Sequence, residues 1–349
     1  MEKFLNFDEF EENAQKEDVA YWVNDLRSSI ALESIIQTPA FCRLKDISFL
    51  GAIDYSERNE ITKGHRNRFV HSLYVAGIAN YVATTRNYCD ELKDNIVAAA
   101  LLHDVGHIPL SHSAEPYIKN NFGYGHHEIG DNLICGSAWK DSGLKKALSR
   151  NFDVKFITSL LNGESTSEGA DIFNNKINAD TIDGILRCIE YKGKNHVRYM
   201  NRISIAKAAF IDSSDLCENK KLDILDDFWR TKHFVYHHFI NNMSGVISDK
   251  LSQVYFEENS KIKHKDLISE EQNWRGKYRG LFSWLGQLKN KKIPSCLKYY
   301  DLEFVTRKYE VLVEEKSIAK RYINKKQKTK ISESYLKTYQ EVDFKREQE

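Results

Sequence analysis

Residues 91–103 (ELKDNIVAAALLH) constrain the fold most, because their second half is apolar on every side. A helix that is apolar all round has to be buried among other elements. The stretch ends in His103 and Asp104, and Gly106 and Pro109 stop the helix directly afterwards. Polar residues at the end of a buried helix need partners, since an unpaired buried imidazole or carboxylate is costly. The sequence therefore predicts a central buried helix that ends in a polar site.

The rest of the chain also has mainly helical patterns. Only four prolines occur in 349 residues, and apolar residues recur at three- and four-residue steps in residues 72–86, 178–191 and 223–242. Residues 51–64 (GAIDYSERNEITKG) differ, since a glycine at each end encloses a polar centre. We therefore expect an all-α fold with a short β-hairpin near residues 51–64.

Composition excludes several classes of protein. Hydrophobic residues make up 41% and charged residues 29%, which argues against a disordered chain. The apolar run Ile96–Leu102 is far shorter than the roughly 20 residues of a membrane-spanning helix. Residues 1–12 are acidic and show no signal peptide, and the six cysteines form no CxxC pair. We expect a cytoplasmic protein without membrane contact and without a thiolate zinc site.

Charge is distributed unevenly along the chain. Residues 250–349 contain 23 Lys+Arg and 15 Asp+Glu, so the remaining residues hold 28 basic and 35 acidic side chains. The densest basic stretch is Lys320–Lys330, which indicates contact with phosphates or nucleic acid, or else a solvated helix face or frayed tail. We expect one domain over residues 1–250 and a basic helical region over residues 251–349, packed on the first.

Histidines gather in one part of the chain. Seven of the twelve lie within residues 65–127. A core histidine satisfied by its neighbours would explain a single such residue, but not an adjacent His–Asp pair with another histidine one apolar helix upstream. A divalent metal would satisfy His71, His103 and Asp104 together, through imidazole nitrogen and carboxylate oxygen. We expect a metal site.

Five segments in order resemble the HD-domain phosphohydrolases, and within them the deoxynucleotide triphosphohydrolases of the SAM-and-HD-domain type and the bacterial dGTPases. The resemblance covers close to half of the chain. It rests on IIQTPAFCRLKDISFLG (35–51), NRFVHSLYVAG (67–77), LLHDVGHIPLSHSAE (101–115), HHEIG (126–130) and NADTIDGILR (178–187). It implies that residues 1–250 form a helical HD phosphohydrolase domain.

The resemblance also implies which residues hold the metal. The implied ligands are His71, His103, Asp104 and Asp180. Local spacing alone does not choose Asp180, because Asp183 lies one turn further along the same predicted helix. Asp183 is interpreted as a helix charge or as an acceptor that orients a ligand. The implied cofactor is a divalent ion (Mn, Fe, Co, Ni, Zn or Mg).

By the same resemblance, His112 is the catalytic histidine, supported by Glu115 and His127. A protonated imidazole there would give a proton to the leaving oxygen. His107 follows a helix end and is expected to support the ligands. Arg68 resembles the arginine that contacts phosphate in the family, although a lone arginine more often forms a surface salt bridge.

The substrate pocket matches the family less well than the metal site does. The helix DDFWRTKHFVYHHF (226–239) resembles a family helix, and it suggests substrate contacts from Arg230, Lys232 and Tyr236. Residues that depart from the SAM-and-HD pattern are Phe49, Thr181, Gly184 and Cys188. These departures leave the base and sugar open and weaken the triphosphate assignment.

Three functions follow from these observations. The first is a metal-dependent phosphohydrolase acting on nucleotides, specifically a dNTP triphosphohydrolase that releases nucleoside and triphosphate. The second is an HD phosphodiesterase or nuclease acting on oligonucleotides, cyclic or modified nucleotides. The third is a non-catalytic module that binds a nucleotide. The resemblance also implies a homo-oligomer.

Overall fold

The structure is a computed structural model that describes residues 15–56, 67–139, 143–190, 200–212, 216–259, 261–290, 292, 294 and 302–331. Helices dominate these residues, as the sequence predicts. The chain divides into two compact units, each built from separated segments. They do not follow the boundary predicted at residue 250, because α15 (Met243–Asn259) runs through that position and packs against α7 (Ser111–Phe122). Long-range helix packing decides which segments group together.

The first unit comprises Met1–Cys42, Phe69–Gly106 and His127–Phe228. Its elements are α1 (Val19–Asp25), η2 (Leu26–Ser28), α2 (Ile30–Ile36), α3 (Pro39–Cys42), α5 (Arg68–Thr85), α6 (Asp90–Leu102), α8 (His126–Cys135), α9 (Leu144–Leu148), α10 (Val154–Leu161), α11 (Asp171–Asn174), α12 (Ala179–Glu190), α13 (Arg202–Phe210) and most of α14 (Glu218–Val235).

Helix α6 is the buried helix that the sequence predicts. Every residue from Asn95 to Leu102 is buried, and α6 packs against α2 and α10. Asp90 and Glu91 lie in the first turn, where carboxylates favour the helix N-terminus. His103 and Asp104 follow the last turn. None of the helices in the described part of the chain has both the length and the apolarity that crossing a membrane requires.

Helix α12 presents polar residues on one side and apolar residues on the other. Asn178 caps its N-terminus, since the Asn178 side chain accepts a hydrogen bond from the Thr181 N–H at 2.8 Å. Ile182, Leu186 and further apolar side chains are buried. Asp180 and Asp183, three residues apart, lie on neighbouring turns of the polar side.

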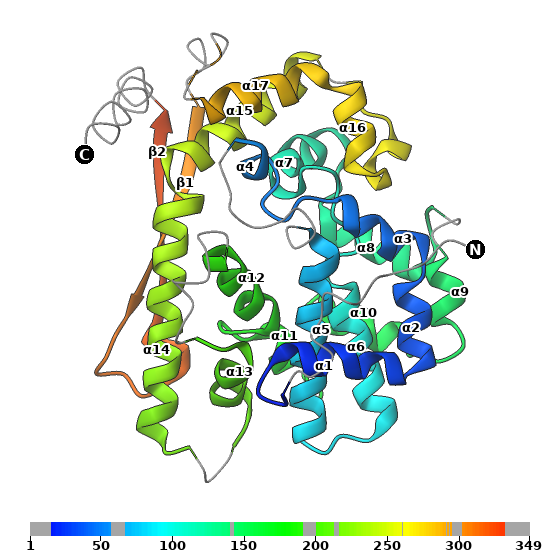
Figure 1. The fold of residues 1–349 in the computed structure, drawn as a ribbon, viewed down its shortest axis with the longest axis vertical. Helices are drawn as coiled ribbons and strands as arrows, with labels where there is room; N and C mark the ends of the chain where they lie inside the picture. The colour runs from blue at the N-terminus through cyan, green and yellow to red at the C-terminus, as the bar shows by residue number, and fades with distance from the viewer. Residues whose placement is uncertain are drawn as a thin grey trace. The chain divides into compact units, whose positions relative to one another are not determined.

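The second unit comprises Arg43–Arg68, His107–His126 and Trp229–Glu349. Its elements are η3 (Arg43–Asp46), α4 (Ile53–Ser56), α7, the π-helix η7 (Tyr236–Ile240), α15, the 3-10 helix η8 (His264–Ile268), α16 (Glu271–Lys277), α17 (Arg279–Lys289), α18 (Ile318–Arg321) and the strands β1 (Leu302–Val311) and β2 (Tyr322–Ile331). In Figure 1, α4 and α7 lie with α15 and α17, and the packing of these four helices is dense.

The described part of the predicted hairpin near residues 51–64 contains a short helix. Residues 53–56 form helix α4, which packs on α15 and α17 and buries Ile53 and Ser56; residues 57–66 lie outside the described part. In the described part of the chain, the paired strands lie in residues 302–331, where β1 and β2 are antiparallel and Arg307 lies opposite Lys326. We expected a helical region beyond residue 250, but it also contains these two strands, because alternation of side chains in residues 302–311 favours a strand over a helix.

Candidate functional site

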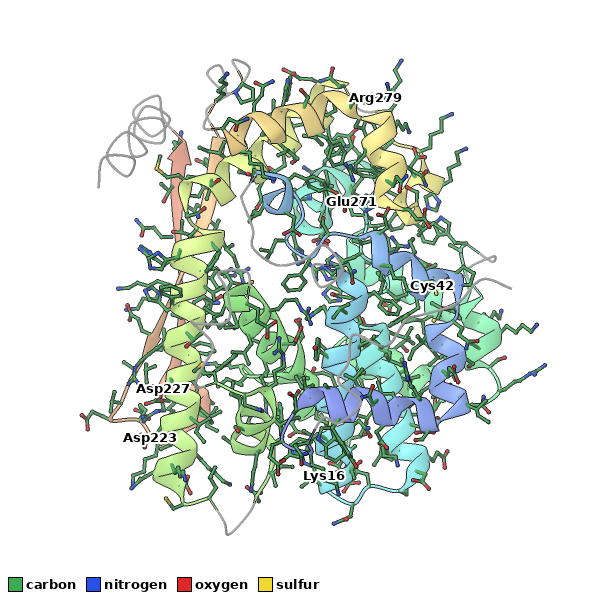
Figure 2. All side chains as sticks on the ribbon, viewed as in Figure 1. Lys16, Cys42, Asp223, Asp227, Glu271 and Arg279 are labelled. Atoms are coloured by element: carbon green, nitrogen blue, oxygen red, sulfur yellow. The ribbon has the colours of Figure 1, made fainter. Side chains whose placement is uncertain are left out.

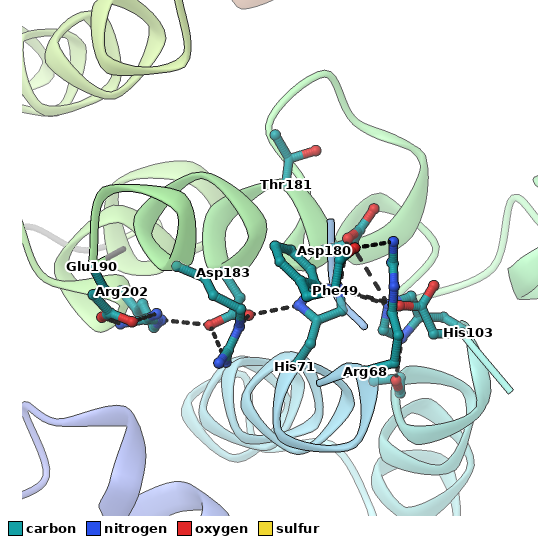
Figure 3. A network of polar contacts seen from close by, with 12 residues as sticks. Phe49, Arg68, His71, His103, Asp180, Thr181, Asp183, Glu190 and Arg202 are labelled. Atoms are coloured by element: carbon teal, nitrogen blue, oxygen red, sulfur yellow. Dashed lines mark hydrogen bonds and ion pairs between the residues drawn. The ribbon is translucent and has the colours of Figure 1, made fainter. Parts of the chain in front are cut away.

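Three helices or helix ends of the first unit bring the four implied ligands together, and Figure 3 labels His71, His103 and Asp180 among them. His71 lies on α5, His103 and Asp104 follow α6, and Asp180 lies in the first turn of α12. His71 Nε2 lies 3.1 Å from Asp180 Oδ1, 3.2 Å from His103 Nε2 and 3.5 Å from Asp104 Oδ2. His103 Nε2 lies 3.5 Å from Asp104 Oδ2. Side chains distant in sequence thus converge on one small volume.

The hydrogen bonds of the two imidazoles fix which nitrogen faces that volume. His71 Nδ1 lies 2.6 Å from Asp183 Oδ2, and an ionised carboxylate only accepts, so Nδ1–H is the donor. His103 Nδ1–H donates to the carbonyl of Ala100 at 2.7 Å. In neutral imidazoles, both Nε2 atoms then carry lone pairs. When both imidazoles are neutral, as metal ligation requires, the two Nε2 atoms and the oxygens of Asp104 and Asp180 are four acceptors in mutual contact.

Such an acceptor-only group fits a divalent cation. A proton would satisfy one pair of atoms, whereas a cation satisfies all four at once. Two imidazole nitrogens and two carboxylate oxygens suit Mn, Fe, Co, Ni or Zn, and Mg would depend more on the carboxylates. His71, His103 and Asp104 also meet the geometric requirement of a metal site, with ligand atoms within 4.8 Å of one another.

Asp183 connects His71 to a buried network of charges. Its carboxylate accepts from Arg187 Nε at 2.8 Å and from Arg202 Nε at 2.7 Å, besides the bond from His71. Arg202 also forms two bonds with Glu190, at 2.6 and 3.1 Å. Although burial alone would raise the pKa of Asp183, the two guanidinium groups and His71 hold it well below its usual value. Asp183 is thus ionised and orients His71.

Asp180 differs from Asp183 in its exposure. The Asp180 side chain is 58% exposed, whereas that of Asp183 is fully buried. Desolvation opposes ionisation of Asp180, but its contact with His71 prevails and lowers the pKa of Asp180 to about 2. Burial acts to lower the pKa of His71, and the adjacent carboxylates of Asp180 and Asp183 raise it above the ordinary value, so a cation at this position has to displace the proton that His71 would otherwise bind. The ligand group therefore has one solvent-facing member.

A second polar group forms in the second unit around Glu115 of α7. Glu115 Oε2 lies 3.0 Å from His112 Nδ1, and Oε1 lies 2.6 Å from His126 Nδ1 and 3.0 Å from the His126 N–H. The His107 ring stacks on that of His126, with centroids 4.2 Å apart. His112 is 60% exposed. One carboxylate thus orients two imidazoles and leaves each Nε2 turned away from it.

Protonation at this group follows from its contacts. Desolvation favours the neutral acid, yet bonds from His112 and His126 lower the pKa of Glu115 well below its usual value. Desolvation, Arg68 and His126 lower the pKa of His112 below the ordinary value, against the bond to Glu115. Glu115 is therefore ionised, His112 Nδ1 carries a hydrogen, and Nε2 is the nitrogen that takes up or releases a proton.

Residues 68–169 match the family model of the HD domain. The match contains His71, His103 and Asp104, and Asp180 lies shortly beyond it. Over residues 68–169, the chain is similar to the HD domain. The resemblance that the sequence suggested, to HD-domain phosphohydrolases of the deoxynucleotide triphosphohydrolase kind, is confirmed at the level of this domain and of its named relatives.

Known proteins similar to this chain support the resemblance to HD-domain phosphohydrolases. The "Deoxynucleoside triphosphate triphosphohydrolase SAMHD1 homolog" of Dictyostelium discoideum is 26% identical over 62% of the chain and 45% of its own length. A "Deoxyguanosinetriphosphate triphosphohydrolase-like protein" of Rickettsia typhi is 37% identical over 29% of the chain and 23% of its own length. The chain spans less than half the length of either relative.

A solved structure supports the fold of this HD-domain chain. The crystal structure of a hypothetical protein from Aquifex aeolicus superposes with a TM-score of 0.60 at 15% identity, covering 89% of this chain and 95% of that one. At this identity the likeness concerns the fold alone.

The structure places one residue of the HD domain differently from the sequence interpretation. Glu115 contacts His126, whereas the sequence assigned support of His112 to the adjacent His127, which is exposed. The dipeptide His126–His127 offers no local signal that distinguishes the two. Glu115 and His112, three residues apart on α7, meet as their spacing suggests. The role of His127 stays a prediction.

Arg68 is buried, in contrast to a surface salt-bridge residue. Its Nη2 donates to the carbonyl of Phe49 at 2.7 Å, its Nε donates to Ser111 Oγ at 3.3 Å, and its guanidinium lies 4.9 Å from the centre of the Phe49 ring. Arg68 also acts on the pKa of His112. A guanidinium next to the polar group of Glu115 is suitably placed for an anionic ligand of that group.

The three other predicted substrate contacts lie on α14 and η7. Lys232 Nζ lies 4.9 Å from the centre of the Tyr309 ring, and the Tyr236 ring packs against the same ring with centroids 4.7 Å apart. Lys232 and Tyr236 thus contact the hairpin. Arg230 is exposed. Their binding of substrate stays a prediction.

Proposed function

We propose that the protein is a metal-dependent phosphohydrolase acting on nucleotides, and specifically a dNTP triphosphohydrolase that releases nucleoside and triphosphate. The observation that carries the proposal is the convergence of His71, His103, Asp104 and Asp180 as four acceptors, with both imidazoles oriented by hydrogen bonds on Nδ1. The names of the relatives support the choice of substrate class.

These ligands would place a divalent cation where it polarises a phosphate oxygen and supplies an acidified water. Release of triphosphate breaks the bond between the α-phosphorus and the 5′ oxygen of the nucleoside. Water adds to phosphorus, and the departing oxygen takes a proton. His112 would hold that proton on Nε2, while Glu115 keeps Nδ1–H in place and stabilises the charged imidazole.

The lowered pKa of His112 makes this role depend on substrate. At neutral pH, the imidazole is mainly neutral in the free protein, because its pKa lies below the ordinary value. A bound polyphosphate would add negative charge and raise the pKa of His112, so that the acid form is created when substrate is present. Arg68 would help to hold the polyphosphate through its bidentate fork.

The decisive experiment combines elemental analysis with product identification. Purified protein, supplied in turn with Mn, Fe, Co, Ni, Zn and Mg ions, is incubated with the four dNTPs, and nucleoside and triphosphate are quantified. Asp104→Ala should lose bound metal and turnover together, whereas His112→Ala should keep metal and lose about 10²–10⁴-fold in rate. No phosphate product from any dNTP would reject the proposal, and equal metal loss in both variants would reject the division of roles.

A second candidate is a phosphodiesterase or nuclease, and the β-hairpin favours it. Register and strand alternation place Lys326, Lys328, Lys330 and Arg307 on one side, here called the basic face. Arg307 lies directly opposite Lys326, and like charges in such cross-strand pairs are destabilising. Successive lysines on this face are separated by about 6.7 Å, from the rise per residue of a strand.

The other side of the hairpin is a matched control. There, Lys308 and Lys325 pair with Glu310 at 3.0 and 2.5 Å. On the basic face, Lys330 lies 4.0 Å from Glu303. A nucleic acid backbone would therefore bind the basic face more strongly than the side on which Glu310 neutralises Lys308 and Lys325.

Salt dependence of binding tests this candidate. If the basic face binds single-stranded DNA, changing its three lysines to Gln should lower the slope of log K against log salt by about 2. Changing Lys308 and Lys325 to Gln should lower it less. Cleavage of the bound strand that is lost in His103→Ala would favour a nuclease, whereas equal slopes for both variants would remove the argument from the hairpin.

Three further proposals are tested separately. A non-catalytic module would bind metal and nucleotide without turnover in the product assay. The homo-oligomer that the resemblance implies can be measured by light scattering on the eluting protein. A cytoplasmic location stays a prediction that cell fractionation would check.

A further inference from the structure

The backbone that precedes His112 is held in an unusual conformation. Leu110 has φ 63° and ψ 13°, and Ser111 has φ 45°, so two successive non-glycine residues lie in the left-handed region. Such a residue is strained and persists only where its surroundings hold it. His112 follows directly, in the first turn of α7. The contacts that hold Leu110 and Ser111 therefore also determine where His112 lies.

A buried carboxylate from the C-terminal third supplies one of these contacts. Glu271 begins α16 (labelled in Figure 2) and is 1% exposed. Its Oε2 accepts from the Leu110 N–H at 2.7 Å, and the same oxygen accepts from the Ser48 N–H at 3.2 Å and from Ser48 Oγ at 2.9 Å. Its Oε1 accepts from the Tyr55 hydroxyl. One side chain thus joins three segments of the second unit.

Two other contacts close the same turn. Ser111 Oγ donates to the Ser48 carbonyl at 2.7 Å. Gly51, with φ +63°, lies so near that an added Cβ would be 2.3 Å from the Leu110 carbonyl oxygen. Residues 48–51 thus pack against the turn at Leu110 and Ser111, and Oε2 of Glu271 binds both segments.

A carboxylate is a costly choice for this position unless its charge is needed. Burial raises the pKa of Glu271, which shows that desolvation outweighs the four hydrogen bonds. A neutral amide would avoid that cost, but an ionised oxygen that accepts from three donors forms stronger, charge-assisted bonds. The negative charge of Glu271 strengthens its bond to the N–H of Leu110, which is one of the two strained residues.

We propose that Glu271 is a positioning residue: it holds the left-handed turn at Leu110 and Ser111, and thereby keeps His112 in its hydrogen bond to Glu115. The inference rests on the proposed function only in that His112 acts as the acid. It gives the C-terminal third, through α16, a direct effect on the chemistry of the HD-domain protein.

The test compares Glu271→Ala and Glu271→Gln with the control Glu270→Ala. Glu270 is the exposed preceding residue, and its side chain forms no cap bond to α16. The first readout is the nitrogen NMR spectrum of histidine-labelled protein, with His112 assigned from His112→Ala. In the wild type, the neutral His112 should carry its hydrogen on Nδ1, as the bond to Glu115 requires.

In Glu271→Ala, His112 should lose this fixed tautomer and show the mixture of a free imidazole. The value of kcat should fall about 10–100-fold, the cost of a misplacement near 1 Å, with KM within about twofold. Bound metal should not change. Glu271→Gln, which keeps an acceptor oxygen, should restore the Nδ1 tautomer and most of kcat, and Glu270→Ala should match the wild type.

Two results would overturn the proposal. One is an unchanged His112 tautomer in Glu271→Ala, even if its melting temperature falls, because the carboxylate would then be structural only. The other is the same tautomer loss in Glu270→Ala. If Glu271→Ala does not fold, Tyr55→Phe replaces it, because this variant removes the bond to Oε1 of the same carboxylate, and the His112 tautomer must then become partly mixed. If the wild type hydrolyses no nucleotide, the proposed function fails, but the tautomer still decides the role of Glu271.

Discussion

Replacement of Asp183 by Asn should separate orientation of a ligand from ligation itself. Asp183 is fully buried and accepts bonds from His71, Arg187 and Arg202. Its loss as an anion removes a carboxylate from both buried guanidinium groups, of which Arg202 also binds Glu190. Removing one member of a buried ion pair costs about 3–5 kcal/mol. We expect Asp183→Asn to lower the free energy of unfolding by that amount, even in metal-free protein.

The same variant should also weaken metal binding. Without an ionised acceptor, Nδ1–H of His71 no longer has a partner that fixes the ring, and loss of such a partner costs about 10–100-fold in metal affinity. The matched control is Asp180→Asn. Its side chain is 58% exposed, so its unfolding free energy should change by about 1 kcal/mol or less, while its metal affinity falls more than in Asp183→Asn.

Urea unfolding in chelator and calorimetric titration with Mn²⁺ would measure the two effects. We expect opposite rankings in the two assays: Asp183→Asn loses more stability than Asp180→Asn, and Asp180→Asn loses more affinity for Mn²⁺ than Asp183→Asn. If Asp183→Asn unfolds at the wild-type urea concentration, Asp183 does not support the buried network. If Asp180→Asn binds Mn²⁺ as tightly as the wild type, Asp180 is not a ligand.

Three further predictions follow from individual residues. Burial raises the pKa of Asp249 from 3.8 to about 6, so between these pH values the folded protein keeps a proton that the unfolded chain releases, and stability falls as pH rises through them. Relative to Asp249→Asn, the unfolding free energy of the wild type should drop by up to about 3 kcal/mol between pH 4 and pH 7. Urea titrations that show no drop would contradict this. If His112 is the acid, kcat/KM should decline with rising pH around a midpoint below 6.5. The value of kcat should decline around a higher midpoint, because bound phosphate raises the pKa of His112. Coincident midpoints would argue against a charge on His112 that the substrate induces. Gly51→Ala should lower the unfolding free energy by more than about 1 kcal/mol, because of its positive φ and the close Leu110 oxygen; an unchanged thermal melt would refute the close approach.

Helices and the metal-ligand types were accessible from the sequence because they depend on local spacing. The apolar pattern of residues 91–103 predicts the buried helix, and the following His103–Asp104 pair predicts the polar site at its end. Asp180 could be proposed as a ligand only from the family resemblance, since two aspartates one turn apart look alike until their exposure is known.

Residues that depend on long-range contacts were assigned less well. The hairpin was expected in residues 51–64, where α4 instead packs on α15 and α17, and the strands pair in residues 302–331. His126, the neighbour of the predicted His127, contacts Glu115. Lys232 and Tyr236 contact Tyr309 of the hairpin, a use that helical spacing did not suggest.

The sequence by itself determined that this chain is mainly helical and that histidine and aspartate follow a buried helix. These features follow from the periodicity of a helix and from the cost of burying polar groups without partners. The tertiary structure alone decided that Asp180 is the exposed and Asp183 the buried member of their pair, and that Glu271 binds the backbone next to His112. Such choices depend on the packing of segments far apart in the chain, for which no local pattern carries the information.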